Sequence, residues 1–311
     1  MIVTVTLNPA VDRTYFIKDF AWNRTIRSSQ SVVGMGGKAT DASWVLGELG
    51  YANLVLGFAA GDTGRLMEKM LRQRGCKTDF VRVEGETRTN IVVISSEGNG
   101  QSTLAEPGLQ IGAGHMEQFR RKFSAALKKA NCVLIGGSVP PGMDVSVYTE
   151  LVKQARQAGL PVVFDASGPG LKAGMEGGPT IAKPNADEIA ELYGQPVTTI
   201  EEAYKAGREL QDKYGAALVI TLGREGALAV LPGCAYSIPV LKIPAVSTAG
   251  AGDAVLAGLA AALSEGKPTE DGLRLGFAAA AAVCLTPATA DCRRADVERL
   301  LPQIELTPYV G

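Results

Sequence analysis

The sequence has few of the side chains on which common catalytic sites depend. Its 311 residues include a single histidine, His115, in a glycine-rich segment that predicts an exposed helix start. Ser-His-Asp catalysis and histidine metal sites therefore lack their parts. The chain also has no Gly-x-x-x-x-Gly-Lys-[Ser/Thr] motif, which excludes a P-loop nucleotide site.

Cysteine pairs, net charge and long apolar runs are missing as well. The five cysteines are scattered without a Cys-x-x-Cys pair, so no zinc cage or disulfide framework is indicated and a reducing cytoplasm is expected. The 31 basic and 32 acidic residues give a net charge of -1, which favours no nucleic-acid or anionic-membrane partner. Apolar stretches at 255–263 and 277–285 are shorter than the roughly 20 residues of a membrane helix, so we expect no membrane segment.

The chain does have the pattern of one α/β domain over residues 1–311. Hydrophobic residues make up 46% of it, enough for a buried sheet. Strands are predicted at 132–135, 161–165, 217–221, 227–231 and 236–240, and helices at 145–158, 187–193, 200–214, 253–265 and 269–285. This alternation predicts a mostly parallel sheet flanked by helices.

The first third of the chain interrupts this rhythm. Segments 13–19, 29–33 and 88–95 alternate polar with apolar residues, as half-exposed antiparallel strands do. The segments between them return to helix (40–49), strand (53–58) and helix (64–75). We therefore expect a small lid sheet that is discontinuous in sequence, with strands within about 12–35 and 87–105.

The segment Thr248-Ala249-Gly250-Ala251-Gly252-Asp253 joins a short strand region to a helix. Its small residues let backbone N–H groups approach an anion at the helix N-terminus. Asp253 in the first turn is placed to accept a proton from an attacking hydroxyl group. The alternative is a favourable first-turn acid after a tight glycine turn.

A second glycine-rich turn, Gly34-Met35-Gly36-Gly37-Lys38, follows a strand-like run and opens the helix near Thr40. It also indicates an anion site. The spacing Gly34-x-Gly36-x-x-Ala39 matches a dinucleotide-binding fingerprint, which offers a nicotinamide or flavin enzyme as an alternative. That site needs an acid at the end of the next strand, and strand 53–58 ends without one.

Three further segments follow predicted strands. In Lys183-Pro184-Asn185-Ala186-Asp187-Glu188, the side chains of Asn185 and Glu188 face the same way and suit a hydrated magnesium ion, or alternatively form a capping box. The turn Thr221-Leu222-Gly223-Arg224-Glu225-Gly226 follows a buried strand, where it could lie beneath a bound nucleotide. Gly136-Gly137-Ser138 ends the strand 132–135 at the edge where open α/β sheets bind ligands, so Ser138 either contacts substrate or caps a turn.

Together these segments resemble the ribokinase-like PfkB carbohydrate kinases, in the branch of 1-phosphofructokinase and tagatose-6-phosphate kinase. The resemblance covers essentially the whole chain. It is carried, in order, by Thr6-Leu7-Asn8-Pro9-Ala10-Val11-Asp12, Thr87-Arg88-Thr89-Asn90, Glu106-Pro107-Gly108, Gly137-Ser138-Val139-Pro140-Pro141-Gly142, Lys183-Pro184-Asn185 and Gly250-Ala251-Gly252-Asp253. It implies a three-layer ribokinase-like fold and a kinase that uses ATP and Mg²⁺ on a sugar or sugar phosphate, with a homodimer formed through the lid.

The resemblance also implies a role for each matching residue. Asp253 is the base, and Gly250, Ala251 and Gly252 form the anion hole. ATP is bound by Lys183, Asn185, Thr221, Gly223, Gly226, Gly250 and Gly252, and the metal is supported indirectly by Asn185 and Glu188. Substrate contacts fall to Asp12, Arg24, Arg27, Gly36, Gly37, Lys38, Asp41, Arg88 and Ser138, of which the basic residues meet a phosphate group.

The chain departs from the family at the second glycine turn. The pattern Gly-Gly-Lys-Gly-x-Asn appears here as Gly36-Gly37-Lys38-Ala39-Thr40-Asp41. An amide that donates and accepts hydrogen bonds is thereby replaced by an acid that, when ionised, only accepts. The acceptor is expected to be a ketohexose phosphate such as fructose 1-phosphate, fructose 6-phosphate or tagatose 6-phosphate. Because of this departure, two alternatives remain: the acceptor is a different or unphosphorylated sugar, or the protein is a sugar or nucleotide sensor without catalytic activity.

Overall fold

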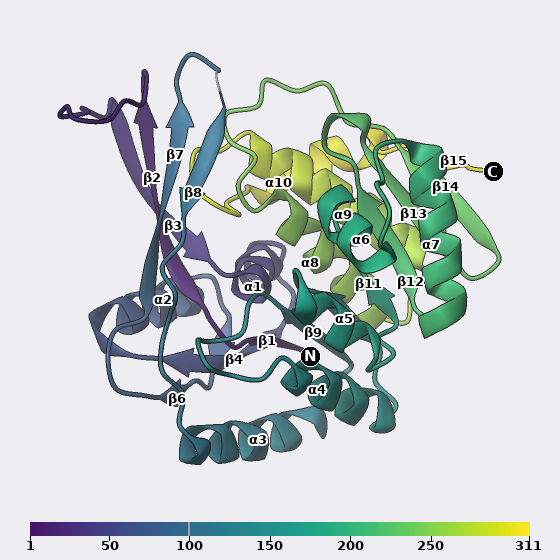
Figure 1. Cartoon of the computed structure of the whole chain (residues 1–311), viewed down its shortest axis with the longest axis horizontal. Helices are drawn as coiled ribbons and strands as arrows, with labels where there is room; N and C mark the ends of the chain where they lie inside the picture. Colours follow the sequence, from purple (N-terminus) through teal and green to yellow (C-terminus); the bar gives the residue numbers. More distant parts are fainter. Residues whose placement is uncertain (99) are drawn as a thin grey trace.

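The computed structural model describes residues 1–98 and 100–311 and is built around a large twisted sheet (Figure 1). The strand order of this 11-stranded sheet is β15-β14-β13-β12-β11-β10-β9-β1-β4-β5, with β6 paired to β4. The strands are β1 (Ile2–Thr6), β4 (Asn53–Ala59), β5 (Lys77–Thr78), β6 (Val81–Arg82), β9 (Cys132–Gly136), β10 (Val162–Asp165), β11 (Ile181–Ala182), β12 (Ala217–Thr221), β13 (Ala227–Leu231), β14 (Cys234–Ile238) and β15 (Thr307–Pro308).

Pairing is parallel from β5 and β6 through β12 and antiparallel from β12 to β15. All residues of β1 and β9 are buried, because helices cover both faces of the sheet. The parallel strands therefore end at one edge, where the loops after β1, β9, β10 and β11 meet.

Helices form a layer on each face of the sheet (Figure 1). One layer contains α3 (Ala113–Leu127), α4 (Ser146–Gln157), α5 (Pro169–Met175), α6 (Ala186–Tyr193) and α7 (Ile200–Tyr214), and the other contains α1 (Lys38–Glu48), α8 (Ala251–Ser264), α9 (Thr269–Cys284) and α10 (Arg294–Leu300). Successive strand residues point to opposite faces of the sheet. Val3 and Val5 of β1 therefore pack against the first helix layer, and Ile2 packs against the second. Helix α2 (Gly61–Gln73) packs in a third cluster with Val55 of β4.

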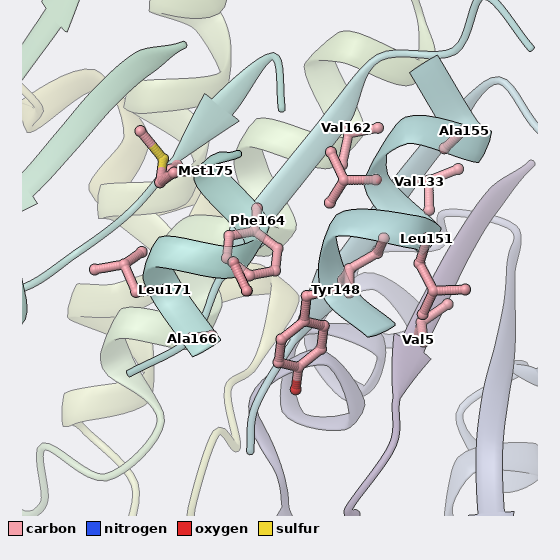
Figure 2. Packing of buried hydrophobic residues seen from close by; sticks show 14 of the residues in the cluster. Val5, Val133, Tyr148, Leu151, Ala155, Val162, Phe164, Ala166, Leu171 and Met175 are labelled. Carbon is pink, nitrogen blue, oxygen red and sulfur yellow. The ribbon is translucent and has the colours of Figure 1, made fainter. Parts of the chain in front are cut away.

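Two buried aromatic residues, Tyr148 and Phe164, pack near the edge where the parallel strands end (Figure 2). Tyr148 of α4 meets Phe164 of β10 edge to face, with 5.4 Å between ring centroids. Its hydroxyl group donates a 2.7 Å hydrogen bond to the carbonyl oxygen of Gly137. The core thereby holds the loop that carries Ser138.

A separate four-stranded sheet, the lid, has the order β3-β2-β7-β8. Its strands are β2 (Ala10–Ile17), β3 (Gln30–Gly36), β7 (Arg88–Ser95) and β8 (Gln101–Leu104). The expectation that these strands are all antiparallel is wrong, because β2 and β7 pair in parallel. Each belongs to its own antiparallel hairpin, and the two hairpins, separated by α1, β4 and α2 along the chain, join side by side.

The fold class expected from the sequence is confirmed: an α/β fold of the ribokinase type with a mostly parallel sheet and a small second sheet. Several short elements were not predicted, among them α5, α10 and the strands β5, β6, β11 and β15. The strand expected at 236–240 begins earlier, at Cys234, because it pairs with β13 across a two-residue turn. None of the helices within residues 1–98 and 100–311 is long and apolar enough to cross a membrane.

Candidate active site

A cavity of about 480 Å³ lies between the lid and the carboxyl edge of the large sheet. Lid strands contribute Asp12, Arg88 and Gln101 to its wall, and the loop after β9 contributes Ser138. The N-terminal turns of α1 and α8 supply further residues, including Asp41 and Asp253. Segments that are far apart in sequence, but matched the same family pattern, therefore meet in one cavity.

The first turn of α8 begins at a glycine for a steric reason. Gly250 is the residue before the helix, has φ of 80°, and lies so close to the backbone of Ala290 that a Cβ atom would overlap it. The N–H groups of Ala251 and Asp253 donate to carbonyl groups of the same turn, whereas no hydrogen bond among the described residues uses the N–H of Gly250 or Gly252. Of the three predicted anion-hole residues, Gly250 and Gly252 thus offer free donors at a positive helix end.

Asp253 occupies the third position of α8 and faces the cavity. Burial raises the pKa of its carboxyl group to about 7, although nearby Lys38 and Lys183 oppose the rise. A carboxylate that titrates near neutral pH is a suitable general base. The predicted position in the first helical turn is confirmed.

Asp41 lies in the first turns of α1, one helical turn after Lys38, and is only 3% exposed. Its side chain lies within hydrogen-bonding reach of the Asp253 carboxyl group, and its Oδ1 atom has no hydrogen-bond partner among the described residues. Burial raises the pKa of Asp41, and the negative charges of Asp253 and Asp12 raise it further. The departure from the family pattern therefore lies beside the candidate base.

Lys38 is directed away from Asp41 into a buried ion network. Its Nζ atom lies 2.7 Å from Asp165 and 3.3 Å from Glu188, while Lys183 lies 2.8 Å from the second oxygen of Asp165. Burial opposes the charge of Lys38, but the carboxylates of Asp165 and Glu188 raise its pKa overall. Lys38 therefore reaches the cavity as an ion whose charge is already balanced.

Asp12 and Asn90 form a polar pair on the lid side of the cavity. The Asn90 amide donates a 2.9 Å hydrogen bond to Asp12, and burial raises the pKa of Asp12. Gly36 lies directly against the Asp12 carboxyl group, where a Cβ atom would overlap it, and the next residue, Gly37, has φ of 93°. These glycines allow the lid and α1 to approach closely around Asp12.

Arg88 is the cavity's other cation, and its guanidinium group binds backbone. It donates to the carbonyl oxygens of Asn8 (2.8 Å) and Glu106 (3.0 Å). Asn8 in turn donates to Ser138 Oγ at 3.1 Å and to the Pro107 carbonyl at 3.0 Å. Among the ion pairs formed by residues 1–98 and 100–311, none includes Arg88, so its charge remains available to an anion.

Arg24 and Arg27 are not brought to this cavity. Both line a separate hollow in the β2–β3 connection at the end of the lid, where Arg24 pairs with Asp19 at 2.9 Å. Residues 22–28 form no strand and connect the ends of β2 and β3. Within one subunit they cannot share a ligand with Arg88.

The predicted nucleotide segments lie along the same sheet edge, next to the cavity. Asn185 and Thr221 form an isolated parallel bridge, and the N–H of Thr221 donates to the Pro184 carbonyl at 3.1 Å. Gly223 and Gly226 have φ of 58° and 90° in the turn after β12. Lys183 runs beside Gly252, which joins these segments to the anion hole.

Asn185 and Glu188 form the capping box that was the alternative to a metal site. Asn185 Oδ1 accepts from the Glu188 N–H and Glu188 Oε2 accepts from the Asn185 N–H, both at 2.8 Å. No cluster of three or more potential metal-ligating side chains occurs in the described part of the chain. A magnesium ion that keeps its waters fits here through outer-sphere contacts, since both Glu188 oxygens already accept hydrogen bonds.

Sequence reasoning missed Asp165, Asn8 and Asn90 as site residues. Asp165 ends a buried parallel strand at the ligand edge, and this position was the available signal. Asn8 and Asn90 belong to two of the segments that resemble the family, but nothing in the sequence indicated a function for either of them. Their functions depend on contacts between distant segments, which a sequence does not display.

Comparisons with known proteins agree with this geometry. The chain is 32% identical to the 1-phosphofructokinase of Bacillus subtilis, with 99% of each chain covered. It is 31% identical to the tagatose-6-phosphate kinase of Staphylococcus epidermidis over 88% of this chain and 89% of that one. The structure of Escherichia coli phosphofructokinase-2 in complex with substrates and products superposes with a TM-score of 0.88 at 25% identity, covering 97% of this chain and 98% of that chain.

The profile of the pfkB family of carbohydrate kinases matches residues 5–296, nearly the whole chain. Kinase family membership implies phosphoryl transfer from ATP to a carbohydrate. The dinucleotide alternative for the Gly34 to Ala39 turn is thereby excluded. The chain is a member of the pfkB carbohydrate kinase family.

Proposed function

We propose that this protein transfers the γ-phosphoryl group of ATP to a hydroxyl group of a ketohexose phosphate, such as fructose 1-phosphate, fructose 6-phosphate or tagatose 6-phosphate. The substrates named for its relatives support this choice. The observation that carries the proposal is the position of Asp253, next to the free Gly252 N–H and in one cavity with Arg88 and Asp12.

In the proposed reaction Asp253 takes the proton of the acceptor hydroxyl group. The acceptor oxygen forms a bond to the γ-phosphorus, and the bond to the bridging oxygen of ATP breaks, so that ADP leaves with the electron pair. The Gly252 N–H at the positive end of α8 is placed to stabilise charge on the transferred group. Lys183 adds positive charge beside it.

The acceptor would lie between the lid and α1. Arg88 provides an unpaired charge for its phosphate group, while Asp12 and Ser138 provide hydrogen-bonding groups for sugar hydroxyls. Gly36 and Gly37 let the lid and α1 approach closely around the Asp12 carboxyl group. Lys38 contributes indirectly, by holding Asp165 and Glu188 in place.

ATP would extend from the Gly252 turn along the sheet edge, past Lys183 and Asn185 to Thr221, with Gly223 and Gly226 shaping the turn beneath it. Asn185 and Glu188 would hold Mg²⁺ through water and nucleotide oxygens. When bound, the ion neutralises charge on the triphosphate. The residues of this segment orient the nucleotide and keep its γ-phosphoryl group at the anion hole.

We also propose a homodimer formed through the lid. The outer face of the lid carries a cross-strand row of Arg13 with the apolar residues Val33, Ile91 and Leu104, which are 40% to 56% exposed. Exposed apolar side chains on a four-stranded sheet favour a second copy of the same surface. Escherichia coli phosphofructokinase-2 has been determined in a tetrameric inhibited form, which shows that this relative assembles.

A coupled ATP-consumption screen over phosphorylated and free ketoses, aldoses and nucleosides tests the proposed function. Phosphorylation of a ketohexose phosphate is expected. The Asp253→Asn variant should lose about 100-fold or more in turnover while ATP binding is largely retained. Near-normal turnover in that variant, or preference for an unphosphorylated acceptor, would contradict the proposal, and silence across the panel would favour a sensor.

A further inference from the structure

We propose that Asp41 is a positioning residue that shares one proton with Asp253: Asp41 remains a neutral acid and donates a hydrogen bond to the Asp253 carboxylate. This inference rests on the proposed role of Asp253 as the base. It begins from the position of the two carboxyl groups, which line one cavity from the N-terminal turns of the adjacent helices α1 and α8 and lie within hydrogen-bonding reach of each other.

Two carboxyl groups in hydrogen-bonding contact cannot both ionise without strong repulsion. The contact also needs a proton between the oxygens, because an ionised carboxylate only accepts hydrogen bonds. The pair therefore holds one proton over an extended pH range and titrates as a unit. The remaining question is which residue carries that proton.

The surroundings assign the negative charge to Asp253. Asp253 lies near Lys38 and Lys183, which lower its pKa, and near Asp165, which raises it, and its helix end presents the free N–H groups of Gly250 and Gly252. Asp41 is 3% exposed, and its Oδ1 atom has no hydrogen-bond partner. An ionised carboxylate with an unpaired buried oxygen is costly, whereas a neutral acid in the same position costs less.

The charged groups that face Asp41 support the same assignment. Lys38 of its own helix is directed to Asp165 and Glu188 and does not face Asp41. Asp12 from β2 and Asp253 from α8 both oppose a second negative charge. Arg88 from β7 is the one facing cation that favours ionisation of Asp41, and burial outweighs it in raising the pKa of Asp41.

A neutral Asp41 has two consequences for the reaction. It orients the Asp253 carboxylate and keeps its pKa from rising further. It also adds no charge beside Arg88, so a phosphorylated acceptor is not repelled as it would be by an ionised acid. The substitution of acid for amide at this position thus preserves a neutral hydrogen-bond donor, as the asparagine of the family pattern would.

Variants at position 41 test the proposal through the acid limb of kcat/KM against pH. Asp41→Asn keeps a neutral donor, so the midpoint should stay at the wild-type value. Asp41→Ala removes the donor, so the midpoint should rise by about one pH unit, the scale of a hydrogen bond to an ionised group. Glu68→Gln, which removes a buried carboxyl group of α2 outside the cavity, is the matched control and should leave the midpoint in place.

The sign of the shift decides between the protonation states. If Asp41 were ionised, both variants would remove a negative charge next to Asp253 and the midpoint would fall. If Asp41 had only a structural role, both variants would change stability and leave the midpoint unmoved. A fall in either variant, or an unmoved midpoint in a folded Asp41→Ala protein, therefore overturns the proposal. If the Asp41→Ala protein does not fold, the pH profile of Asp41→Asn and infrared spectra of the carboxyl groups still test the proposal.

Infrared difference spectroscopy gives a second result that requires no acceptor. Above the pKa of Asp253, the wild type and Asp253→Asn should both show the carbonyl stretch of a protonated carboxylic acid, and Asp41→Asn should lose that band. Its persistence in Asp41→Asn, or its absence from the wild type, would overturn the proposal. If no sugar is phosphorylated, the proposed function fails, but the spectra still show where the proton resides.

Discussion

Lys38 and Asp165 are separated by 127 positions in the chain, yet the Lys38 ammonium group lies 2.7 Å from the Asp165 carboxylate. Lys183 pairs with the other oxygen of the same fully buried carboxylate. Asp165 thus binds two lysines at the end of β10, beneath the site where phosphoryl groups would meet. This contact gives Lys38 a structural task in addition to its place in the wall of the cavity.

Asp165→Asn should destabilise the protein strongly. The change leaves the buried ammonium group of Lys183 without its counter-charge, and breaking a buried ion pair in this way costs about 3 to 5 kcal/mol. Urea unfolding measures the loss. Asp62→Asn, which removes an exposed carboxylate from its pair with Arg65, is the control and should cost less than about 1 kcal/mol. Equal effects in the two variants would contradict the network's role.

Activity should decrease below neutral pH. The base must be ionised to accept a proton, and burial raises the pKa of Asp253 to about 7. The value of kcat/KM should therefore rise with pH through an acid limb whose midpoint is about 7 and level off above it. A profile that stays flat through neutral pH would argue against Asp253 as the base.

Arg88→Ala should discriminate between phosphorylated and free sugars. The loss of an unpaired guanidinium group that binds a phosphate should raise KM for a ketohexose phosphate by about 10- to 100-fold. KM for the corresponding free sugar should change little. Steady-state kinetics with both acceptors make the comparison, and Arg65→Ala on the exposed surface of α2 is the control. An equal rise for both sugars would show that Arg88 supports the lid instead of the phosphate.

Gly250→Ala should reduce both stability and turnover. Gly250 has φ of 80° and abuts the backbone of Ala290, so a methyl group there adds overlap to backbone strain. Gly266 has a similar φ of 67° but no neighbour within 4 Å, so Gly266→Ala should show the backbone strain alone, about 1 kcal/mol. Thermal unfolding and turnover of the two variants measure the difference. Matching losses would mean that the packing of α8 against Ala290 is unimportant.

Placing a charged residue on the exposed face of the lid should disrupt the proposed dimer. Ile91→Lys or Leu104→Lys places an ammonium group in the exposed apolar row and should convert a dimer to a monomer in size-exclusion chromatography with light scattering. Val240 is 55% exposed outside the lid, so Val240→Lys is a matched control and should remain dimeric. A monomeric wild type, or dimers in both lid variants, would exclude this interface.

The sequence alone determined the class of the fold and the position of the candidate base in the first turn of a helix. Strand and helix periods predicted the parallel units, and the small residues before Asp253 predicted a helix N-terminus open to an anion. These inferences succeed because they depend on local properties: side-chain period, glycine conformation and helix-end polarity.

Only the tertiary structure decided which partner each charged residue has. It directed Lys38 to Asp165, left Arg88 unpaired, separated Arg24 and Arg27 from the cavity, and joined Asp41 to Asp253. It also paired β2 with β7 in parallel. Such contacts link segments that lie far apart in the sequence. The pKa of a carboxyl group depends on its burial and on the charges that the fold places around it. Neither can be predicted from the residues next to it in the sequence.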